Sequence, residues 1–402
     1  MRDRPIRVLI VDDSATVRKV VSDSLAGNPD IEVIGTAVDP YVARDKILAL
    51  NPDVLTLDIE MPRMDGLTFL RLLMKHRPMP VIVMSSLTRE SSQIALEALQ
   101  AGAVDVFSKP GNSMSAHADG ARLAEKIKAA AGARIRVGHA VPPVVKPTVR
   151  PHHPHEPAPA VRAAERALAP APASSGRRYS SRHLIVMGAS TGGTEALKEV
   201  LTQLPSDLPG ICVVQHIPAH FSTAFANRLN ELCELEVKEA ANGDRVEPGR
   251  VLIAPGGHHL VLRWNANHYT AQLTDGPMVH HQRPAVDVLF DSAAKAGSAT
   301  STLAILLTGM GADGAAGMLT LRQGGATTWA QNEESCVVFG MPREAILRGA
   351  AQKVLPLDQI AGAINRYADM MAIGSEKLTT GTPSSHAAAL TLSAGSRAGS
   401  GS

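Results

Sequence analysis

The sequence has few aromatic residues and no marked excess of either charge. Aromatic residues make up 3% of the 402 residues, and only two of them are tryptophans. This scarcity argues against a surface of stacked rings that would bind single-stranded nucleic acid. Lysine and arginine total 40 against 38 acidic residues, for a formal net charge of +2. We therefore expect no nucleic-acid partner, because neither stacking nor net charge indicates one.

Cysteines and long apolar runs are also scarce. Cys212, Cys233 and Cys336 are widely spaced and lack the spacing of metal ligands, so we interpret them as reduced core residues. No stretch approaches the roughly 18 apolar residues of a membrane span. The first apolar run ends at Asp12 and Asp13, too early for a secretory signal. These features predict a cytoplasmic protein that does not insert into a membrane, and we expect it to be a monomer.

The middle of the chain differs sharply from its flanks. Nine prolines lie between residues 142 and 172, and residues 134–182 carry nine basic and two acidic side chains. Such a segment favours an extended, solvated spacer. Its histidines, His152, His153 and His155, are explained better by that spacer than by a metal site. We predict a first domain at residues 1–125, a linker at 126–182, a second domain at 183–372 and a disordered tail at 373–402.

Both flanks alternate short β-branched runs with helical patterns, which is typical of α/β proteins with parallel sheets. The fold class predicted is α/β with two doubly wound domains. The first has five strands in a flavodoxin-like arrangement, and the second has a parallel sheet with an antiparallel excursion at residues 236–274. Strands of the first domain are expected at residues 6–13, 32–37, 54–58, 80–86 and 104–110, and the second domain begins with a strand at 183–190.

Polar residues stand where the strands of the first domain end. They are Asp12, Asp13, Asp58, Ser85 and Lys109, and strand ends of a doubly wound sheet converge on one rim. Clustered carboxylates suit Mg²⁺, which binds oxygen ligands and accepts a phosphate oxygen. A carboxylate can also be the nucleophile that forms an aspartyl phosphate. Any one of them alone, such as Asp13, is explained as well by helix capping, but five such residues at the strand ends together favour a site.

The segments VDDSATVRKVV, LDIEMPRMDGL, MSS and FSKP closely resemble the receiver domain of two-component response regulators, over residues 1 to about 125. The resemblance implies a phosphorylation site that uses Mg²⁺. It assigns Asp58 as the phosphoacceptor, Asp12 and Asp13 as metal ligands together with Asp58, Ser85 and Lys109 as the phosphate-sensing pair, Phe107 as the switch aromatic residue, and a cis peptide to Lys109–Pro110.

The second domain opens with an apolar strand, a glycine-rich turn and an amphipathic helix. Gly188 to Gly192 satisfies G-x-S-x-G with Ser190 at its centre. Such a turn could present a nucleophile, bind an anion at the helix N-terminus or be a plain turn. His216 and Asp313 follow two further strands, and together they supply the base and the acid that a nucleophilic serine requires. The order Ser–His–Asp differs from that of α/β-hydrolases.

Other interpretations remain for single residues. His216 alone could be a buried structural histidine, and Asp313 alone could cap the helix that follows it. The doublets His258–His259 and His280–His281 lack metal-type spacing and an evident acidic partner in the sequence, so we expect them at the surface or in a substrate groove.

The segments GASTGGTEAL, QHIP, APGGHHL, PAVDVLF and LTGMGADGAAGM closely resemble the catalytic domain of the CheB family of chemotaxis methylesterases, from about residue 183 to 370. The linker, which is long and rich in proline, is the visible departure. The resemblance assigns Ser190 as the nucleophile, His216 as the base, Asp313 as the orienting acid, the backbone amide of Met310 as an oxyanion donor, and Thr191 as a residue that positions the histidine.

The two resemblances together imply a phosphorylation-activated enzyme of bacterial chemotaxis. It would hydrolyse glutamate γ-methyl esters on methyl-accepting receptors, releasing methanol, and deamidate receptor glutamines. The chemotaxis histidine kinase would be the phosphodonor, and the esterase reaction would need no cofactor. We expect the unphosphorylated receiver to pack over the Ser190 cleft. The alternatives are a receptor-binding scaffold without turnover and a DNA-binding output, although no basic recognition helix is evident.

Overall fold

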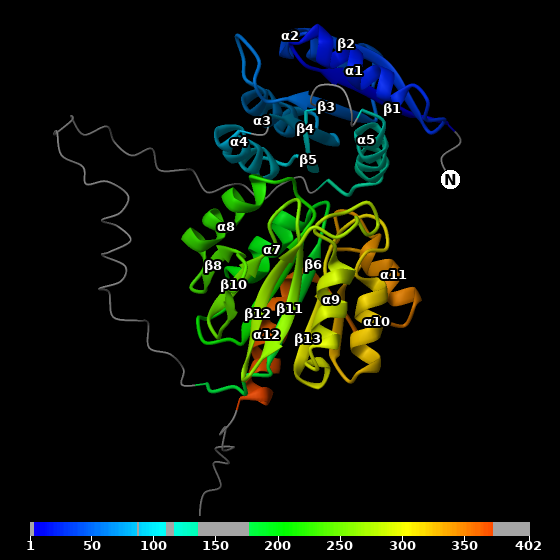
Figure 1. Ribbon diagram of the computed structural model, residues 1–402. Coiled ribbons are helices and arrows are strands. Elements are labelled where there is room, and N and C mark those ends of the chain that lie inside the picture. The colour runs from blue at the N-terminus through cyan, green and yellow to red at the C-terminus, as the bar shows by residue number, and fades with distance from the viewer. Residues whose placement is uncertain (1–3, 87, 110–115, 136–176, 373–402) are drawn as a thin grey trace, which may run out of the picture.

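The computed structural model describes residues 4–86, 88–109, 116–135 and 177–372 (Figure 1). The proline-rich part of the linker with its three histidines, the tail and Pro110 lie outside these residues. Within them, no helix is both long enough and apolar enough to cross a membrane.

The first domain is a five-stranded parallel sheet with the strand order β2-β1-β3-β4-β5. Its strands are β1 (Ile6–Val11), β2 (Ile31–Ala37), β3 (Val54–Asp58), β4 (Val81–Ser85) and β5 (Asp105–Ser108). Its helices are α1 (Ala15–Leu25), α2 (Pro40–Leu50), α3 (Gly66–His76), α4 (Arg89–Gln100) and α5 (Ala116–Ala131). The five predicted strands are confirmed. Helix α5 continues past residue 125, where we had expected this domain to end.

Four helices of the first domain begin after an N-cap residue whose side chain binds the first turn. Ser14, Asp39, Asp65 and Thr88 each precede a helix and accept a hydrogen bond from an amide of its first turn. These caps satisfy amides that would otherwise lack partners within the helix. Because the strands before α1, α3 and α4 are almost entirely buried, the polar residues between strand and helix are held at the rim of the sheet.

The second domain contains a seven-stranded parallel sheet with the order β15-β14-β13-β6-β7-β10-β8. Its strands are β6 (Leu184–Ala189), β7 (Gly210–Gln215), β8 (Glu236–Glu239), β10 (Arg250–Ile253), β13 (Thr302–Leu306), β14 (Thr327–Gln331) and β15 (Lys353–Leu355). The central strand β6 lies between β7 and β13. These three strands therefore carry their following loops to one edge of the sheet.

A separate antiparallel sheet has the order β11-β12-β9, with β9 at Arg245–Val246, β11 at His259–Asn265 and β12 at His268–Thr274. The predicted antiparallel hairpin is confirmed as β11–β12. The prediction that all of residues 236–274 form an antiparallel excursion was wrong, because β8 and β10 pair in parallel within the main sheet. β8 is short and partly polar, as suits the edge strand of that sheet, whereas β10 lies between β7 and β8 and is mostly buried.

Helices cover both faces of the seven-stranded sheet (Figure 1). They are α7 (Gly193–Leu201), α8 (Phe221–Leu232), α9 (Val286–Lys295), α10 (Ala315–Gln323), α11 (Met341–Leu347) and α12 (Leu357–Met371), with a short 3₁₀ turn at Ala299–Ser301. All three cysteines are buried and none forms a disulfide within the described residues, which confirms their interpretation as reduced core residues. Burial raises the pKa of the Cys233 thiol to about 11.

The two domains are packed against each other through α4 of the first and α7 and α8 of the second (Figure 1). Leu96 and Leu99 of α4 line a shallow pocket together with Phe225 and Leu229 of α8. These side chains belong to one continuous cluster of buried apolar residues that extends through both domains. Burial of apolar surface therefore holds the domains in this arrangement.

Candidate functional sites in the two domains

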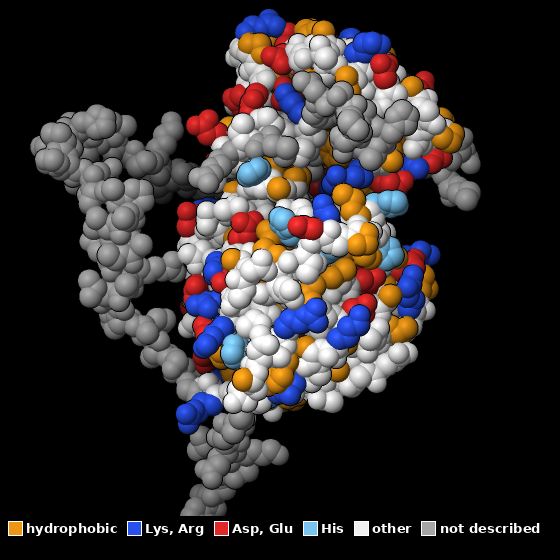
Figure 2. All heavy atoms as spheres, in the orientation of Figure 1, with side chains coloured by type: hydrophobic (Ala, Val, Ile, Leu, Met, Phe, Trp, Pro, Cys, Tyr) orange, Lys and Arg blue, Asp and Glu red, His pale blue; other side chains and the backbone are white. Residues whose placement is uncertain are grey.

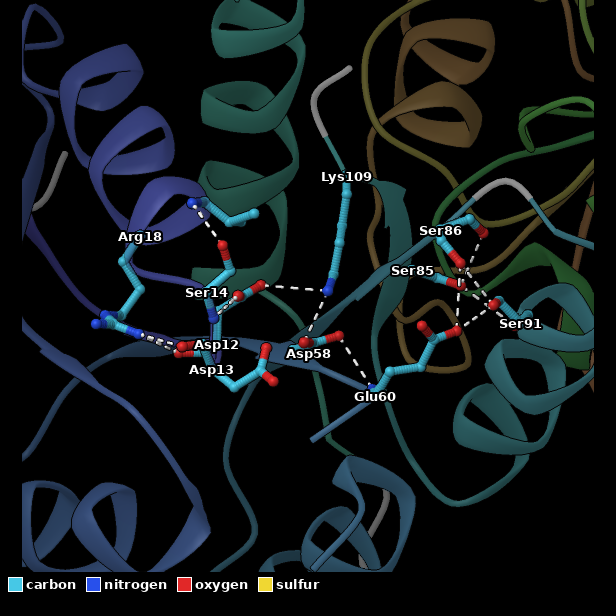
Figure 3. Close-up of polar contacts among 11 residues, drawn as sticks. Asp12, Asp13, Ser14, Arg18, Asp58, Glu60, Ser85, Ser86, Ser91 and Lys109 are labelled. Carbon is cyan, nitrogen blue, oxygen red and sulfur yellow. Dashed lines mark hydrogen bonds and ion pairs between the residues drawn. The ribbon is translucent and has the colours of Figure 1, made fainter. Parts of the chain in front are cut away.

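The first candidate site is an acidic pocket at the carboxyl edge of the five-stranded sheet (Figure 3). Asp12 and Asp13 follow β1, and Asp58 is the last residue of β3. One oxygen of each carboxylate lies within 4.8 Å of the others. Lys109, from the end of β5, places its Nζ 2.7 Å from Asp58 Oδ2 and 3.5 Å from Asp12 Oδ2. The strand ends thus bring together four of the predicted residues.

The buried carboxylates of this pocket are electrostatically costly. The Asp58 side chain is fully buried, and this burial raises its pKa to about 6 while the Lys109 ammonium opposes the rise. Burial likewise raises the pKa of Asp12. Among described residues, Lys109 is the cation that faces their inner oxygens, which have no hydrogen bond beyond this ion pair. A set of oxygen ligands with surplus negative charge fits a divalent cation.

Ser85 and Phe107 lie close by but make different contacts. The Ser85 hydroxyl is buried at the end of β4 and donates to the backbone carbonyls of Ser91 (3.2 Å) and Ser86 (3.3 Å). It is directed into the polar cluster around Glu60 rather than toward Asp58 (Figure 3). Phe107 is buried in an apolar cluster of the first domain. A sensing role for either residue therefore requires a rearrangement, and that role stays a prediction.

We expect Asp58→Asn to stabilise the protein in a pH-dependent manner. The folded-state pKa of about 6 lies above the ordinary value of about 3.9, so the folded state holds the proton longer and stability falls as the pH rises through this window. Asparagine removes that loss. We predict a gain of about 1–2 kcal/mol at pH 7.5, where the lost ion pair with Lys109 offsets part of the benefit, and little gain at pH 4, where Asp58 is already protonated.

Thermal unfolding of the full chain between pH 4 and pH 7.5 measures this effect. Asp45→Asn is the matched control, since that carboxylate is exposed and forms an ion pair with Arg44. A difference between Asp58→Asn and wild type that stays constant with pH would contradict the interpretation.

The second candidate site begins at the turn between β6 and α7. Gly192 has a φ of +77°, and a Cβ there would approach the Val337 side chain to 2.5 Å, so glycine is required on both grounds. Gln215, the last residue of β7, donates from Nε2 to the Ser190 carbonyl at 2.8 Å. The turn is therefore held from both sides, and it fixes Ser190 at the carboxyl edge of the central strand, where it is 7% exposed.

His216 and Asp313 form a buried hydrogen-bonded pair next to this turn. His216 Nε2 lies 2.8 Å from Asp313 Oδ2, and both side chains are almost fully buried. The His216 amide donates to the Ala189 carbonyl at 3.2 Å, so the histidine backbone adjoins the residue before Ser190. With Nε2 committed to Asp313, the Nδ1 atom is the ring nitrogen left for another partner. No Ser190–His216 hydrogen bond is present in the described part of the chain.

Asp313 caps the N-terminus of α9. From the sequence we considered instead the helix that follows Asp313 in the chain, which is α10. The residue before α10 is Gly314, whereas Asp313 accepts from the first amides of α9, Val286 (2.7 Å) and Asp287 (2.9 Å). Although burial opposes it, the hydrogen bonds from His216 and these amides hold the pKa of Asp313 below its usual value. The carboxylate is thus kept ionised and oriented toward His216.

Met310 and Thr191 flank Ser190 from two directions. Gly309, the residue before Met310, lies so close that a Cβ on it would approach Ser190 Cβ to 2.7 Å. The Thr191 hydroxyl donates to Asp105 Oδ2 at 2.5 Å. Its partner is thus a carboxylate of the first domain, and its hydroxyl has no bond to His216 in this arrangement.

Two contacts join the first domain to the serine turn. Asp105, at the start of β5, is buried and binds both Thr191 and Lys126 of α5. Val337 packs against the apolar cluster that contains Phe107, and the same residue crowds Gly192. The segment around Val337 is also tied to Arg134, whose amide donates to the Val337 carbonyl at 3.1 Å. Residues next to Ser190 are therefore in direct contact with the first domain.

The expectation that the histidine doublets lie at the surface is confirmed for His258, His280 and His281 and wrong for His259. His258 and His280 do have acidic partners: His258 Nδ1 is paired with Asp275, and His280 Nε2 lies 3.0 Å from Asp287 Oδ2. His259 is buried, binding the Pro277 carbonyl and the Ala285 amide. The partners come from other loops, so spacing within the doublets gave no signal for them. Histidines gather near the domain boundary on the face shown in Figure 2.

Comparison with known proteins gives two family matches. The response regulator receiver domain profile matches residues 8–129, and the CheB methylesterase profile matches residues 185–364. A relative from Syntrophus aciditrophicus is 54% identical over 90% of this chain and 98% of its own length. A relative from Geobacter metallireducens is 49% identical over 90% of this chain and 95% of its own. Both are named protein-glutamate methylesterase/protein-glutamine glutaminase.

The chain is a response regulator whose output domain is a hydrolase: a receiver with an acidic phosphorylation-type pocket joined to an α/β domain with a buried His–Asp pair beside a serine turn. It belongs to the CheB methylesterase family. We refer below to its receiver and its catalytic domain.

Proposed function

We propose that this protein removes γ-methyl esters from glutamates of methyl-accepting chemotaxis receptors and releases methanol. The observation that carries the proposal is the buried His216–Asp313 pair, placed at the same sheet edge as Ser190. An exposed His–Asp pair would be common and uninformative. A buried one next to a strained glycine turn and a serine supplies the base, the acid and the nucleophile for acyl transfer.

In the proposed reaction the Ser190 Oγ attacks the ester carbonyl while His216 takes its proton. Asp313 holds the histidine through Nε2, so Nδ1 accepts the proton, and the carboxylate stabilises the resulting imidazolium. The Met310 amide, beside Ser190, donates to the oxyanion of the tetrahedral intermediate. Methanol leaves with the proton returned by His216. Water then attacks the glutamyl ester of Ser190 by the same route and releases glutamate.

The same residues can release ammonia from a glutamine side chain, which gives receptor glutamate by deamidation. Only the leaving group differs, and His216 protonates it in either case. The names of the relatives include both activities. Neither reaction involves a cofactor in this proposal.

Phosphorylation of Asp58 by the chemotaxis histidine kinase is the proposed control. Asp12, Asp13 and Asp58 would hold Mg²⁺, which when bound neutralises the pocket and binds an oxygen of the incoming phosphoryl group. Lys109 would then exchange its ion pair with Asp58 for phosphoryl oxygens. Rearrangement of Ser85 and Phe107 would disturb the β5 face that contacts Thr191 and Val337. Docked and open arrangements are then the two states whose populations shift. We place the reaction in the cytoplasm, where thiols stay reduced.

Methanol release from methylated receptor membranes tests the proposal. Wild type and Asp58→Asn are each assayed with and without a small phosphodonor plus Mg²⁺. We expect release by both proteins and stimulation by the phosphodonor in wild type alone. Wild type that releases no methanol under either condition would favour the alternative of a receptor-binding scaffold without turnover.

We expect Asp105→Ala to raise basal methanol release about 3–10-fold in the absence of phosphodonor. The substitution removes the acceptor of the Thr191 hydroxyl and the partner of Lys126, and one lost hydrogen bond between domains is worth about 1 kcal/mol. Because the open arrangement is then already populated, stimulation by the phosphodonor should shrink by a similar factor.

Asp30→Ala is the matched control for this variant. Asp30 pairs with Lys128, which lies on α5 as Lys126 does, but both residues of this pair belong to the receiver. Basal release should stay at the wild-type level. Equal activation by both substitutions would mean that general loosening of the receiver, rather than the contact with Thr191, accounts for the effect.

A further inference from the structure

A second histidine–aspartate pair lies next to His216 and Asp313. His280 Nε2 is 3.0 Å from Asp287 Oδ2. The Asp287 side chain is 9% exposed, while that of His280 is 43% exposed. His280 also has a φ of +51°, a conformation uncommon for a residue with a side chain. The pair therefore connects solvent to a buried carboxylate.

Asp287 connects this pair to the proposed catalytic residues. Its amide donates to Asp313 Oδ1 at 2.9 Å, and its own Oδ1 accepts from the Gly317 amide of α10 at 2.7 Å. Atoms of His280, Asp287 and Asp313 lie within 4.8 Å of one another. Every oxygen of the two carboxylates already has a hydrogen-bond donor. The cluster is thus a hydrogen-bonded network whose carboxylate oxygens are already satisfied, and it does not have the character of a cation site.

The other ionisable groups around the pair are themselves engaged. In the loop that carries His280, Arg283 donates to the carbonyls of Asp275 and Gly276. His258 is paired with Asp275. The Nδ1 of His259 accepts a hydrogen bond from the Ala285 amide. On the elements packed against α9, Arg263 binds Gln272 and Arg322 binds the Gly349 carbonyl. His281 is exposed beside His280.

We propose that Asp287 and His280 are positioning residues. The charge that they place next to Asp313 sets how readily His216 accepts a proton. This rests on the role of His216 in the proposed function. An ionised Asp287 adds negative charge near Asp313, which favours the imidazolium form of His216. A protonated His280 cancels that charge. The base strength of His216 thus depends on the protonation of a histidine exposed at the surface.

The two residues are expected to act in opposite directions, which separates an electrostatic role from a merely structural one. Asp287→Asn removes negative charge, so the acid limb of the pH profile of kcat/KM shifts to lower pH, by about one unit for a neighbouring buried charge. His280→Asn removes positive charge, so the limb shifts to higher pH, by about 0.3 units because the histidine is half exposed. Asparagine suits position 280 because it tolerates left-handed backbone.

The experiment measures methanol release from methylated receptor membranes between pH 5 and 9, with phosphodonor and Mg²⁺ present throughout. His281→Asn and Asp291→Asn are the matched controls: a neighbouring exposed histidine with φ of +60°, and an aspartate one turn along α9. Neither should move the acid limb. Opposite shifts in the two test variants with unchanged KM support the proposal. Shifts in the same direction, or none, overturn it.

A second measurement keeps this inference separate from the proposed function. The ring protons of His216 can be followed by NMR titration of the full chain, whatever its substrate. The His216 pKa should fall in Asp287→Asn and rise in His280→Asn. If wild type hydrolyses no receptor ester, the proposed function fails, yet this titration still decides the inference. If Asp287→Asn does not fold, the His280→Asn shift decides it alone.

Discussion

Ser190→Ala is expected to lower kcat for methanol release by about 10⁴-fold or more, the scale on which nucleophile removal acts in triad hydrolases. The alanine keeps the turn, because the backbone contacts of residue 190 with Gln215 and Thr308 do not involve the hydroxyl. KM should change little, since the hydroxyl forms its bond to substrate only during the reaction. Methanol release over a long incubation, compared with a blank, measures the residual rate.

The receiver supplies the internal control for this variant. Asp58 should still accept phosphate from a small phosphodonor at the wild-type rate, because Ser190 lies in the other domain. Retained phosphorylation and an unchanged unfolding midpoint would show that the loss is chemical. A Ser190→Ala protein that keeps more than about one per cent of wild-type kcat would remove Ser190 as the nucleophile, and Thr191 would be the next hydroxyl to test.

The strand ends were predictable from sequence because parallel pairing leaves little freedom in where they lie. Buried β-branched runs fix the strands, and in a doubly wound sheet their carboxyl ends share one edge. That reasoning placed Asp12, Asp58 and Lys109 together, and His216 next to Asp313. The register of β6 with β7 and β13 then brings Ser190 to the same edge without any further signal.

The contacts that sequence reasoning missed join segments far apart in the chain. Asp105 begins a strand, whereas the expected ligands end strands, and its partner Thr191 belongs to the other domain. Nothing in either local pattern indicates the pairing, which depends on how two apolar faces dock. Gln215 was not singled out from the sequence, although its side-chain amide holds the serine turn.

Asp287 illustrates a different limit. It stands at the start of an amphipathic helix, where an acidic residue is favoured for its effect on the helix dipole alone. The hydrogen bond from its amide to Asp313 forms because the loop before α10 folds across the start of α9, and its pairing with His280 joins it to the loop before α9. The same crossing explains why Asp313 binds the amides of α9 and not those of α10, which helix-capping rules applied along the chain would favour.

Asp313→Asn is expected to lower kcat by about 10⁴-fold, comparable with the loss that amide replacement causes in other serine hydrolases. The carboxylate accepts three hydrogen bonds, from His216 Nε2 and from the amides of Val286 and Asp287. An asparagine has one acceptor oxygen. If that oxygen takes the place of Oδ1 and stays with the Asp287 amide, the NH₂ group takes the place of Oδ2, faces His216 and forces the proton from Nε2 to Nδ1. The Nδ1 atom can then no longer accept the Ser190 proton.

This substitution should cost far more activity than stability, and the difference is the test. Replacing the anion at the start of α9 is expected to reduce the free energy of unfolding by about 1–2 kcal/mol, which leaves the protein folded. Asp291→Asn, on the same helix but outside this network, should match wild type in both measurements. A loss of kcat below about tenfold would mean that His216 keeps its useful tautomer without Asp313. Asp313 would then matter chiefly as the group that holds the start of α9.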